Sequence, residues 1–338
     1  RIHGRHKLLH QRSGIEAQEL AAKAFGAKKT FFLLNGSTAG NLALAMALTK
    51  KGQKILTNRN CHRSVLTGMI ISGAEPLWLI PKRFEDWGIW GNVTPESVEE
   101  MLETHDDVSM VWITNPTYEG VVSDIKSISA ICKRFGVPLI VDEAHACLWN
   151  FNKHLPTPAL QLGADAVVHS LHKTGGSMSQ SSMLHIAENS LIDADAVEKA
   201  LKLLHTTSPS LMLLASLDSA RANLESQRGQ KMLQRAINNA KYLRREIEQM
   251  EHIHDLKPDF GYMTDVTKVF IRADGLSGKR LESTNCKRLK MNFRKTIPKS
   301  VRHNPLQQQF KNQRKKKLFL NSKIILKQNT HFLKISKF

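Results

Sequence analysis

Short apolar stretches alternate with longer segments of helical periodicity over most of the chain. The apolar stretches are rich in β-branched and aromatic residues, as buried strands are, and lie at 30–34, 55–58, 76–80, 108–113, 137–142 and 164–170. Segments with a helical pattern lie at 16–25, 41–49, 62–72, from 95 onward, and at 123–135, 190–204, 210–227 and 229–250. Strands separated by helices need crossover connections, so the pattern predicts an α/β domain with a mostly parallel sheet.

The end of the chain differs from the rest in charge. The net charge of the 338 residues is +19, of which residues 279–338 carry +17, with Glu282 as their one acidic residue. The remaining residues carry +2, so the body of the protein is nearly neutral. Its charge therefore does not indicate a nucleic-acid-binding domain. We expect 281–338 to form a basic, poorly ordered tail without a packed fold. The alternative is an arm that binds nucleic acid or a membrane surface, for which KNQRKKK at 311–317 is the best support.

Composition excludes several other classes of protein. At 41% hydrophobic residues the chain can bury a large core, and its four cysteines lie far apart with no C-x-x-C pair. They are therefore predicted to be reduced thiols of a cytoplasmic protein. The sequence contains no run of 18 apolar residues, so it predicts no membrane-spanning helix. The chain begins at Arg1 with no signal-peptide pattern, which predicts that residues 1–13 are the remnant of a longer N-terminal region.

The first of three candidate segments is NGSTAGN at 35–41, between a predicted strand and a predicted helix. Gly36 permits a tight turn, and Ser37 and Thr38 offer hydroxyl and backbone N–H groups at a helix N-terminus. Such an arrangement is suited to binding a phosphate. The simpler interpretation is an ordinary N-cap made by a serine or threonine.

The second segment is VDEAH at 141–145, where Asp142 ends an apolar strand. A strand that ends in D-E-A-H also suggests a helicase, but that function needs a G-x-x-x-x-G-K-[ST] loop upstream, and the sequence has none. An acidic group at the carboxyl end of a parallel strand can instead face a ligand bound at that edge of the sheet.

The third segment is HSLHKTGGS at 169–177, also directly after a strand. Lys173 lies there among hydroxyl groups, a histidine and two glycines, and a lysine in such surroundings can form a Schiff base. A lone loop lysine is, however, more often a solvent-exposed side chain. His169 and His172 could bind a metal as a pair, but no further ligand follows at a metal-like spacing.

Together the three segments predict a site for pyridoxal 5'-phosphate. The 35–41 segment would hold the phosphate, Asp142 would keep the ring nitrogen protonated, and Lys173 would bind the aldehyde carbon. A fourth part of the site is NRNCHRS at 58–64, in which His62 begins a helix after a strand and could stack on the ring.

The sequence resembles the major domain of the fold-type-I ornithine/lysine/arginine decarboxylases over roughly residues 14–280. The resemblance rests on six blocks in family order: NGSTAGN, NRNCHRS, TNPTYEGV (114–121), VDEAHACLWNF (141–151), HSLHKTGGSMSQSSMLH (169–185) and HTTSPSLMLLASLDSAR (205–221). It implies a fold-type-I pyridoxal-phosphate-dependent transferase-like domain over 14–280. The implied activity is decarboxylation of arginine, lysine or ornithine, a small-molecule substrate, to the corresponding amine and CO₂.

The resemblance also implies a role for each residue that contacts the ring of the cofactor. Lys173 would form the Schiff base, and Asp142 would pair with the ring nitrogen. His62 and Ala144 would pack on the two faces of the ring, and His145 would lie near the ring hydroxyl.

The remaining roles concern the phosphate group. Four residues would hold it within one subunit: Ser37, Thr38, Ser170 and His172. Thr207 would reach the phosphate of a neighbouring subunit, which implies a homodimer or a larger homo-oligomer.

The resemblance stops near residue 283, although members of the family continue into a C-terminal domain. The lysine- and asparagine-rich sequence that follows is typical of a shifted reading frame or degenerate coding. Two alternatives therefore stay open: another fold-type-I activity, such as that of an aminotransferase or a lyase, and an inactive remnant that keeps the fold. The sequence also leaves open which of the three basic amino acids is the substrate.

Overall fold

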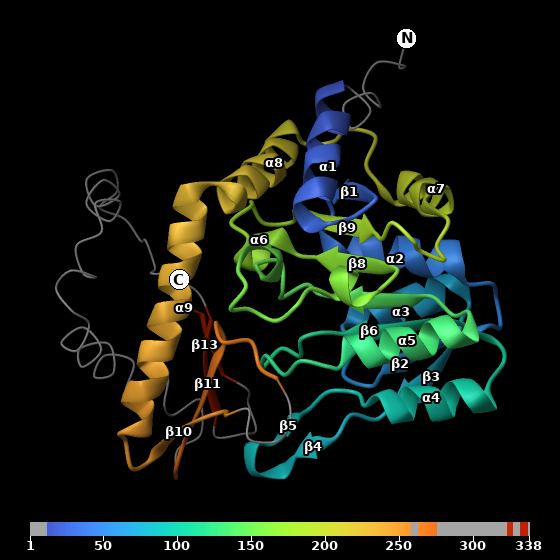
Figure 1. Cartoon of the computed structure of the whole chain (residues 1–338). Coiled ribbons are helices and arrows are strands. Elements are labelled where there is room, and N and C mark those ends of the chain that lie inside the picture. The colour runs from blue at the N-terminus through green and yellow to red at the C-terminus, as the bar shows by residue number, and fades with distance from the viewer. Residues whose placement is uncertain (1–11, 258–262, 276–322, 327–331, 337–338) are drawn as a thin grey trace. The chain divides into compact units, whose positions relative to one another are not determined.

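The computed structural model describes residues 12–257, 263–275, 323–326 and 332–336 (Figure 1). The chain divides into two compact units. The first comprises Arg1–Phe84, Ile89–Ile237 and Pro258–Asp265, and the second comprises Glu85–Gly88, Asn238–Lys257 and Val266–Phe338. All residues that the sequence singles out as candidates for chemistry belong to the first unit.

A seven-stranded sheet forms the centre of the first unit (Figure 1). Its strands are β1 (Lys29–Leu33), β2 (Lys54–Asn58), β3 (Glu75–Leu79), β6 (Val108–Thr114), β7 (Leu139–Asp142), β8 (Ala166–His169) and β9 (Ser182–Ile186). Their order is β1-β9-β8-β7-β6-β2-β3, and only β9 runs antiparallel to its two neighbours. The predicted mostly parallel α/β fold is confirmed. The sequence pattern does not predict β9, because two of its buried residues, Ser182 and His185, are polar and interrupt the apolar run.

Helices of the first unit connect the strands and cover the sheet. They are α1 (Arg12–Phe25), α2 (Gly36–Leu48), α3 (Arg63–Ser72), α4 (Pro95–Thr104), α5 (Ile125–Phe135), α6 (Leu171–Thr174), α7 (Ala194–Leu204), α8 (Leu211–Glu225) and the first half of α9 (Gln227–Glu248). Local signals set their ends: in α5, Asp124 accepts the N–H of Ser127, and Gly136 ends the helix with a φ of +67°. Helix α2 begins earlier than the predicted 41, because the 35–41 segment itself forms its first turn.

Two hydrophobic clusters lie on the two faces of this sheet. One includes Ile140 and Val168 with residues of α2, α3 and α7, and the other includes Val141 and Val167 with residues of α4 and α5. Successive residues of a strand thus enter opposite clusters, as the alternation of side chains in a strand requires. Burial on both faces explains why the parallel strands are nearly continuous apolar runs in the sequence.

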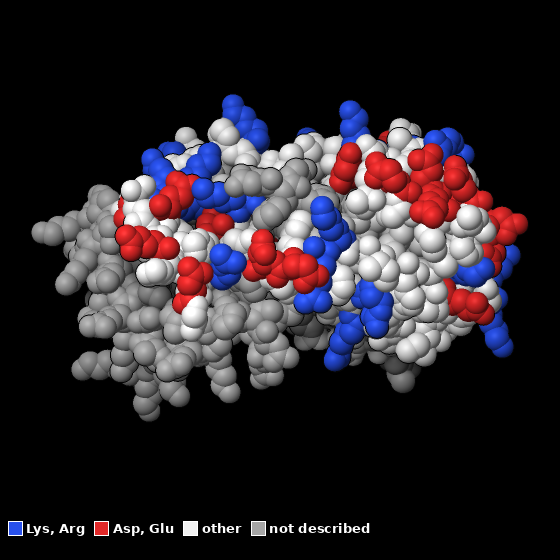
Figure 2. Space-filling view, turned by 90° about the horizontal axis from the view of Figure 1, so that it is seen from below, with Lys and Arg blue, Asp and Glu red and all other residues white. Residues whose placement is uncertain are grey.

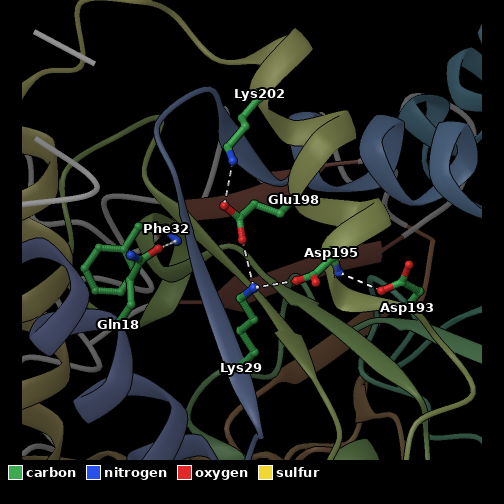
Figure 3. Close-up of polar contacts among 7 residues, drawn as sticks. All are labelled: Gln18, Lys29, Phe32, Asp193, Asp195, Glu198 and Lys202. Carbon is green, nitrogen blue, oxygen red and sulfur yellow. Dashed lines mark hydrogen bonds and ion pairs between the residues drawn. The ribbon is translucent and has the colours of Figure 1, made fainter. Parts of the chain in front are cut away.

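A group of ion pairs connects α7 to the edge strand β1 (Figure 3). The Nζ atom of Lys29 lies 2.8 Å from Oε2 of Glu198 and 3.5 Å from Oδ1 of Asp195, and Lys202 contacts the other oxygen of Glu198 at 2.9 Å. Hydrogen bonds from Lys29 and Lys202 lower the pKa of Glu198 to about 2. The carboxylate therefore stays ionised over the whole ordinary pH range.

Both edges of the sheet carry a feature that limits further strand pairing. At β1, the side chain of Gln18 in α1 accepts the backbone N–H of Phe32 at 2.9 Å (Figure 3). At β3, Pro76 has no backbone N–H to donate. Edge strands without such features are templates for pairing with another chain.

Smaller elements complete the described chain. In the first unit β4 (Arg83–Phe84) pairs with β5 (Ile89–Trp90), and 3₁₀ turns lie at η2 (Trp149–Phe151) and η3 (Ala159–Leu162). The 3₁₀ turn η1 (Glu85–Trp87) belongs to the second unit. The second unit has an antiparallel sheet in the order β10 (Ile253–Asp255), β11 (Val269–Ala273), β13 (Phe332–Ser336), β12 (Lys323–Leu326). Strands β12 and β13 belong to the segment 281–338, whose other residues lie outside the described part of the chain, and the domain boundary at 280 stays a prediction.

Acidic and basic side chains are interspersed on the face that Figure 2 presents. This distribution agrees with the small net charge of residues 1–278. Among the described helices, none has the length and apolar character that crossing a membrane would require.

Candidate active site

The candidate residues lie where β7 and β8 end. Asp142 is the last residue of β7, and Ser170 directly follows β8. The next turn of chain, α6, carries His172 and Lys173. Because β7 and β8 are parallel neighbours, their carboxyl ends meet at the same edge of the sheet. The fold therefore brings the second and third sequence segments together.

Asp142 is held by groups from three segments. Its side chain is 3% exposed; one oxygen accepts the N–H of Ala144 at 3.1 Å, and the other accepts the side-chain amide of Asn41 at 3.3 Å. Asn41 also donates to the hydroxyl of Ser64 at 2.8 Å, which in turn lies 2.7 Å from Nδ1 of His62. A continuous set of hydrogen bonds thus connects the buried carboxylate with His62.

Lys173 is largely removed from water. Its Nζ atom lies 3.2 Å from Nε2 of His145, whose ring meets that of Tyr118 edge to face at 5.4 Å. Burial lowers the pKa of Lys173, while Asp142 and Cys147 act in the opposite direction. A lowered pKa increases the fraction of neutral amine, which is the form that attacks a carbonyl carbon.

His62 has the position expected of a residue that packs on a ring. It is the N-cap of α3, its Nδ1 accepts the N–H of Ser64 at 3.2 Å, and its side chain keeps an exposed surface. Partial burial and the charge of Lys173 lower its pKa, and Asp142 raises it in part. His62 is therefore a neutral ring within electrostatic reach of both groups.

The first turn of α2 has the properties of an anion site. Ser170 donates to the hydroxyl of Ser37 at 2.9 Å, which connects the end of β8 to this turn. Asn35 makes no side-chain cap, because its oxygen accepts the amide of Gln180 at 3.3 Å. Gly36 has a φ of +73°, which favours glycine, and leads into the turn. The first-turn N–H groups are thus left without a capping side chain, as a phosphate site requires.

The other predicted phosphate residues are placed differently. Nδ1 of His172 lies 2.8 Å from the carbonyl oxygen of Ser181, so this nitrogen is the donor of that contact. Thr38 is exposed on α2, and Thr207 is exposed after α7. Within the described part of the chain, neither threonine has a hydrogen bond to another candidate residue.

Sequence reasoning did not assign a role to several residues of this site. Asn41 and Ser64 connect Asp142 to His62, and Cys147 lies 3.0 Å from the hydroxyl of Thr174 beside the lysine. Asn41 itself carries a sequence signal, because it is a polar residue at the start of the otherwise apolar run 41–49, and the structure buries it fully. A buried amide without a function is rare in such a helix.

Metal-ligating side chains do not gather in the described ranges, where no group of three or more could hold an ion. His169 contacts Glu143 at 3.0 Å, whereas His172 contacts Ser181. The two histidines that could have formed a metal pair therefore have different partners.

The chain's residues fit pyridoxal 5'-phosphate. The uncapped first turn of α2 suits a phosphate, and the buried carboxylate of Asp142 suits a protonated ring nitrogen. Lys173 supplies an amine, and the exposed surface of His62 is available for a ring. Asn41 also has a buried side-chain oxygen without a partner among the described residues, so one polar atom of a residue bonded to Asp142 is left unused by the chain.

The α/β architecture with its mostly parallel sheet is that of the fold-type-I class of pyridoxal-phosphate enzymes. The solved structure of L-threonine transaldolase from Pseudomonas fluorescens shares this fold with a TM-score of 0.65 and 17% identity, over 80% of this chain and 60% of that one. The chain matches the family described as Orn/Lys/Arg decarboxylase, major domain, over residues 6–275, and it belongs to that family. The expected family and fold class are confirmed.

Individual relatives are decarboxylases of basic amino acids. The arginine decarboxylase of Bacillus subtilis is 39% identical over 283 residues, which are 81% of this chain and 57% of that protein. The constitutive lysine decarboxylase of Escherichia coli is 28% identical over 263 residues, 73% of this chain and 36% of that protein. The structure of lysine decarboxylase A from Pseudomonas aeruginosa has a TM-score of 0.68 and 26% identity, over 81% of this chain and 44% of that one. The match therefore spans only 57%, 36% and 44% of the length of these three relatives.

Proposed function

We propose that this chain is the cofactor-binding part of a pyridoxal-phosphate-dependent decarboxylase of arginine, lysine or ornithine. The observation that carries the proposal is the meeting of Asp142 and Lys173 at the ends of adjacent parallel strands, in a chain of the decarboxylase family. Arginine is the first substrate to test, because relatives that are 37–39% identical are arginine decarboxylases.

Bound pyridoxal phosphate would supply an electron sink for the pair of electrons that remains when CO₂ leaves. Asp142 would hold a proton at the ring nitrogen, and Asn41 and the N–H of Ala144 keep its carboxylate in place for that task. His62 would orient the ring by packing on one face, and Ala144 would pack on the other. His145 would lie at the ring hydroxyl.

Lys173 would hold the cofactor before the substrate amine displaces it. Its amine would then be free, beside His145, to return a proton to the carbon that lost CO₂. The lowered pKa of Lys173 supports this exchange of roles, because it increases the fraction of neutral amine that can attack and makes the protonated form a better proton donor.

The phosphate and the partner subunit complete the proposal. Ser37, Thr38, Ser170 and His172 would bind the phosphate. We infer a homodimer or larger homo-oligomer in which exposed Thr207 reaches the neighbouring subunit's phosphate. Sedimentation of the purified protein would test this assembly. A cytoplasmic location is proposed because Cys61, Cys132 and Cys147 form no disulfide among the described residues.

The decisive experiment joins cofactor capture with product analysis. The purified protein, mixed with pyridoxal phosphate, should develop a visible absorption band, and borohydride should fix the cofactor to the peptide that contains Lys173. Lys173→Ala should abolish both results, whereas Lys126→Ala, an exposed lysine of α5, should not. An unchanged band in Lys173→Ala would overturn the assignment.

The activity itself is tested by CO₂ release with each of the three amino acids. Release from one of them supports decarboxylation. Transfer of the amino group to an oxo acid without CO₂ release would support an aminotransferase instead, since that class shares the roles of Asp142 and Lys173. Cofactor binding with neither reaction would favour a domain that keeps the fold without turnover.

A further inference from the structure

A fully buried pair of side chains joins β7 and β8 next to the candidate site. Glu143 and His169 are each 0% exposed, and Oε2 of Glu143 lies 3.0 Å from Nε2 of His169. The other oxygen of Glu143 accepts the N–H of Ala159 at 2.9 Å. Both side-chain oxygens of Glu143 therefore have a hydrogen-bond partner, and a hydrogen bond of this kind is directional.

Glu143 and His169 are sequence neighbours of the candidate-site residues Asp142 and Ser170, but their side chains have other partners. Asp142 bonds to Asn41 of α2, whereas its neighbour Glu143 bonds to η3 and to His169. In the same way Ser170 bonds to Ser37 of α2, whereas the preceding His169 bonds to Glu143. Glu143 directly follows β7 and Ser170 directly follows β8, so in each pair of neighbours a contact that fixes one residue also constrains the backbone that carries the other.

Aromatic rings enclose the pair on its own face. Phe25 lies with its ring centre 5.2 Å from that of His169 and 4.6 Å from that of His185. His185 contacts the hydroxyl of Thr30 at 2.8 Å, and burial together with His169 lowers the pKa of His185 well below its usual range. The layer is thus packed by rings, and His185 is neutral.

Stability alone gives no reason to keep ionisable side chains in such a layer. A well-packed apolar pair often serves equally well or better, because burial removes both groups from water. Here Nδ1 of His169 also has no partner among the described residues, which adds to the cost of burial. The contact provides a defined direction and length between the two side chains, which an apolar pair does not.

We propose that Glu143 and His169 are positioning residues that fix the ends of β7 and β8, so that Asp142 and Lys173 meet the cofactor in one geometry. This inference rests on the proposed function, since it names the support of the same site. Loss of the contact lets the two strand ends shift independently. The cofactor then binds more weakly and in an altered orientation, although the fold persists.

Three variants of the full chain test this. Glu143→Ala breaks the contact. His169→Gln keeps a side-chain donor for Glu143, and Thr30→Val is the matched control. The control removes a buried hydrogen bond of the same layer, but in β1, which β9 separates from β8. For each protein we would measure the dissociation constant of pyridoxal phosphate, the visible circular dichroism of the bound cofactor, and the melting temperature without cofactor.

The expected pattern separates positioning from general destabilisation. Glu143→Ala should weaken cofactor binding about tenfold or more, as loss of supporting partners does at comparable sites, and should change the visible dichroism. His169→Gln should keep the cofactor affinity and the visible dichroism close to those of the parent protein. Thr30→Val should lower the melting temperature while leaving affinity and dichroism unchanged. If Glu143→Ala does not fold, Glu143→Gln keeps the acceptor for Ala159 and should give the same changes at smaller size.

Other outcomes overturn the inference. Parent-like affinity and dichroism in Glu143→Ala and Glu143→Gln would show that the contact positions nothing. Equal losses in Glu143→Ala and Thr30→Val would assign the effect to stability alone. If the parent protein binds no cofactor, the proposed function is overturned as well. If the parent binds the cofactor and the variants behave like the control, only the positioning role is overturned.

Discussion

At the scale of single residues, the electrostatics of the site depend on one buried carboxylate. Asp142 is almost inaccessible, yet both of its oxygens have donors. A preorganised charge in such surroundings acts more strongly than it would in water, because the donors do not have to reorient during the reaction. The same burial means that replacing the carboxylate has a large and specific effect.

Asp142→Asn should leave the cofactor bound but decrease CO₂ release by about 10²–10³, the usual result of removing one preorganised electrostatic group. The neutral amide does not stabilise a proton on the ring nitrogen. Steady-state rates measured at saturating cofactor test this, with Asp124→Asn, an exposed cap of α5, as the control. A rate within twofold of the parent would contradict the role of Asp142.

Asn41→Ala should lower stability by about 1–3 kcal/mol, because it leaves Asp142 and Ser64 each short of a buried donor. It should also weaken cofactor binding, since His62 loses its connection to the carboxylate through Ser64. Urea unfolding and a cofactor titration measure the two effects separately. Lower stability with unchanged affinity would limit Asn41 to a structural role.

How far the site can be predicted depends on the range of the interactions. Asp142 and Lys173 are recognisable because each follows an apolar strand, which is a local pattern. Asn41 meets Asp142 only through the packing of α2 on the sheet, and Glu143 meets His169 only because β7 and β8 are neighbours. Contacts between segments distant in sequence leave no periodic signal, so no pattern along the chain reveals them.

At the scale of elements, α7 is tied to β1 by exposed and half-buried charges (Figure 3). Such pairs contribute little individually, but Glu198 accepts from two lysines at once, and its pKa in the folded protein is about 2 against an ordinary value of 4.5. The ionised form is therefore favoured by folding. Its contribution is complete above pH 4.5 and is lost as the pH falls toward 2.

Lys29→Met should therefore lower the free energy of unfolding at pH 7 by no more than about 1 kcal/mol, given the partial exposure of the pair. The difference from the parent should shrink as the pH falls from 4.5 toward 2, because the parent then loses the same interaction. Urea unfolding at several pH values measures it. Lys28→Met, at an exposed lysine without an ion pair in the described structure, should differ little from the parent at any pH. A pH-independent effect of Lys29→Met would indicate lost packing instead.

At the scale of the whole molecule, the candidate site belongs to one unit and the basic end of the chain to the other. Every candidate residue precedes position 210. The fold of the first unit could be predicted from its alternating strands and helices. The second unit could not, because β10 and β11 are short and β11 pairs with β13 across more than 50 intervening residues.

Removal of residues 281–338 should leave the dissociation constant of pyridoxal phosphate within about twofold of the parent, a change too small to reflect the loss of a direct contact. The same deletion removes β12 and β13 from the antiparallel sheet, so the melting temperature should fall. Calorimetry and cofactor titration of the two proteins test this. Loss of cofactor from the shortened chain would give the basic end a part in the site. Sequence-selective nucleic-acid binding by the full chain at moderate salt would support the alternative of an arm.

The hydrogen bond between Gln18 and Phe32 has a consequence for self-association. While α1 is docked, the edge of β1 has one of its outward N–H groups already paired. If α1 detaches, the strand KTFFL presents aromatic, strand-forming residues at an open edge, and such segments are prone to join copies of themselves. The stability of α1 would then control aggregation as well as the fold. Gln18→Ala should increase the aggregation rate at mildly denaturing temperature more than it lowers the melting temperature.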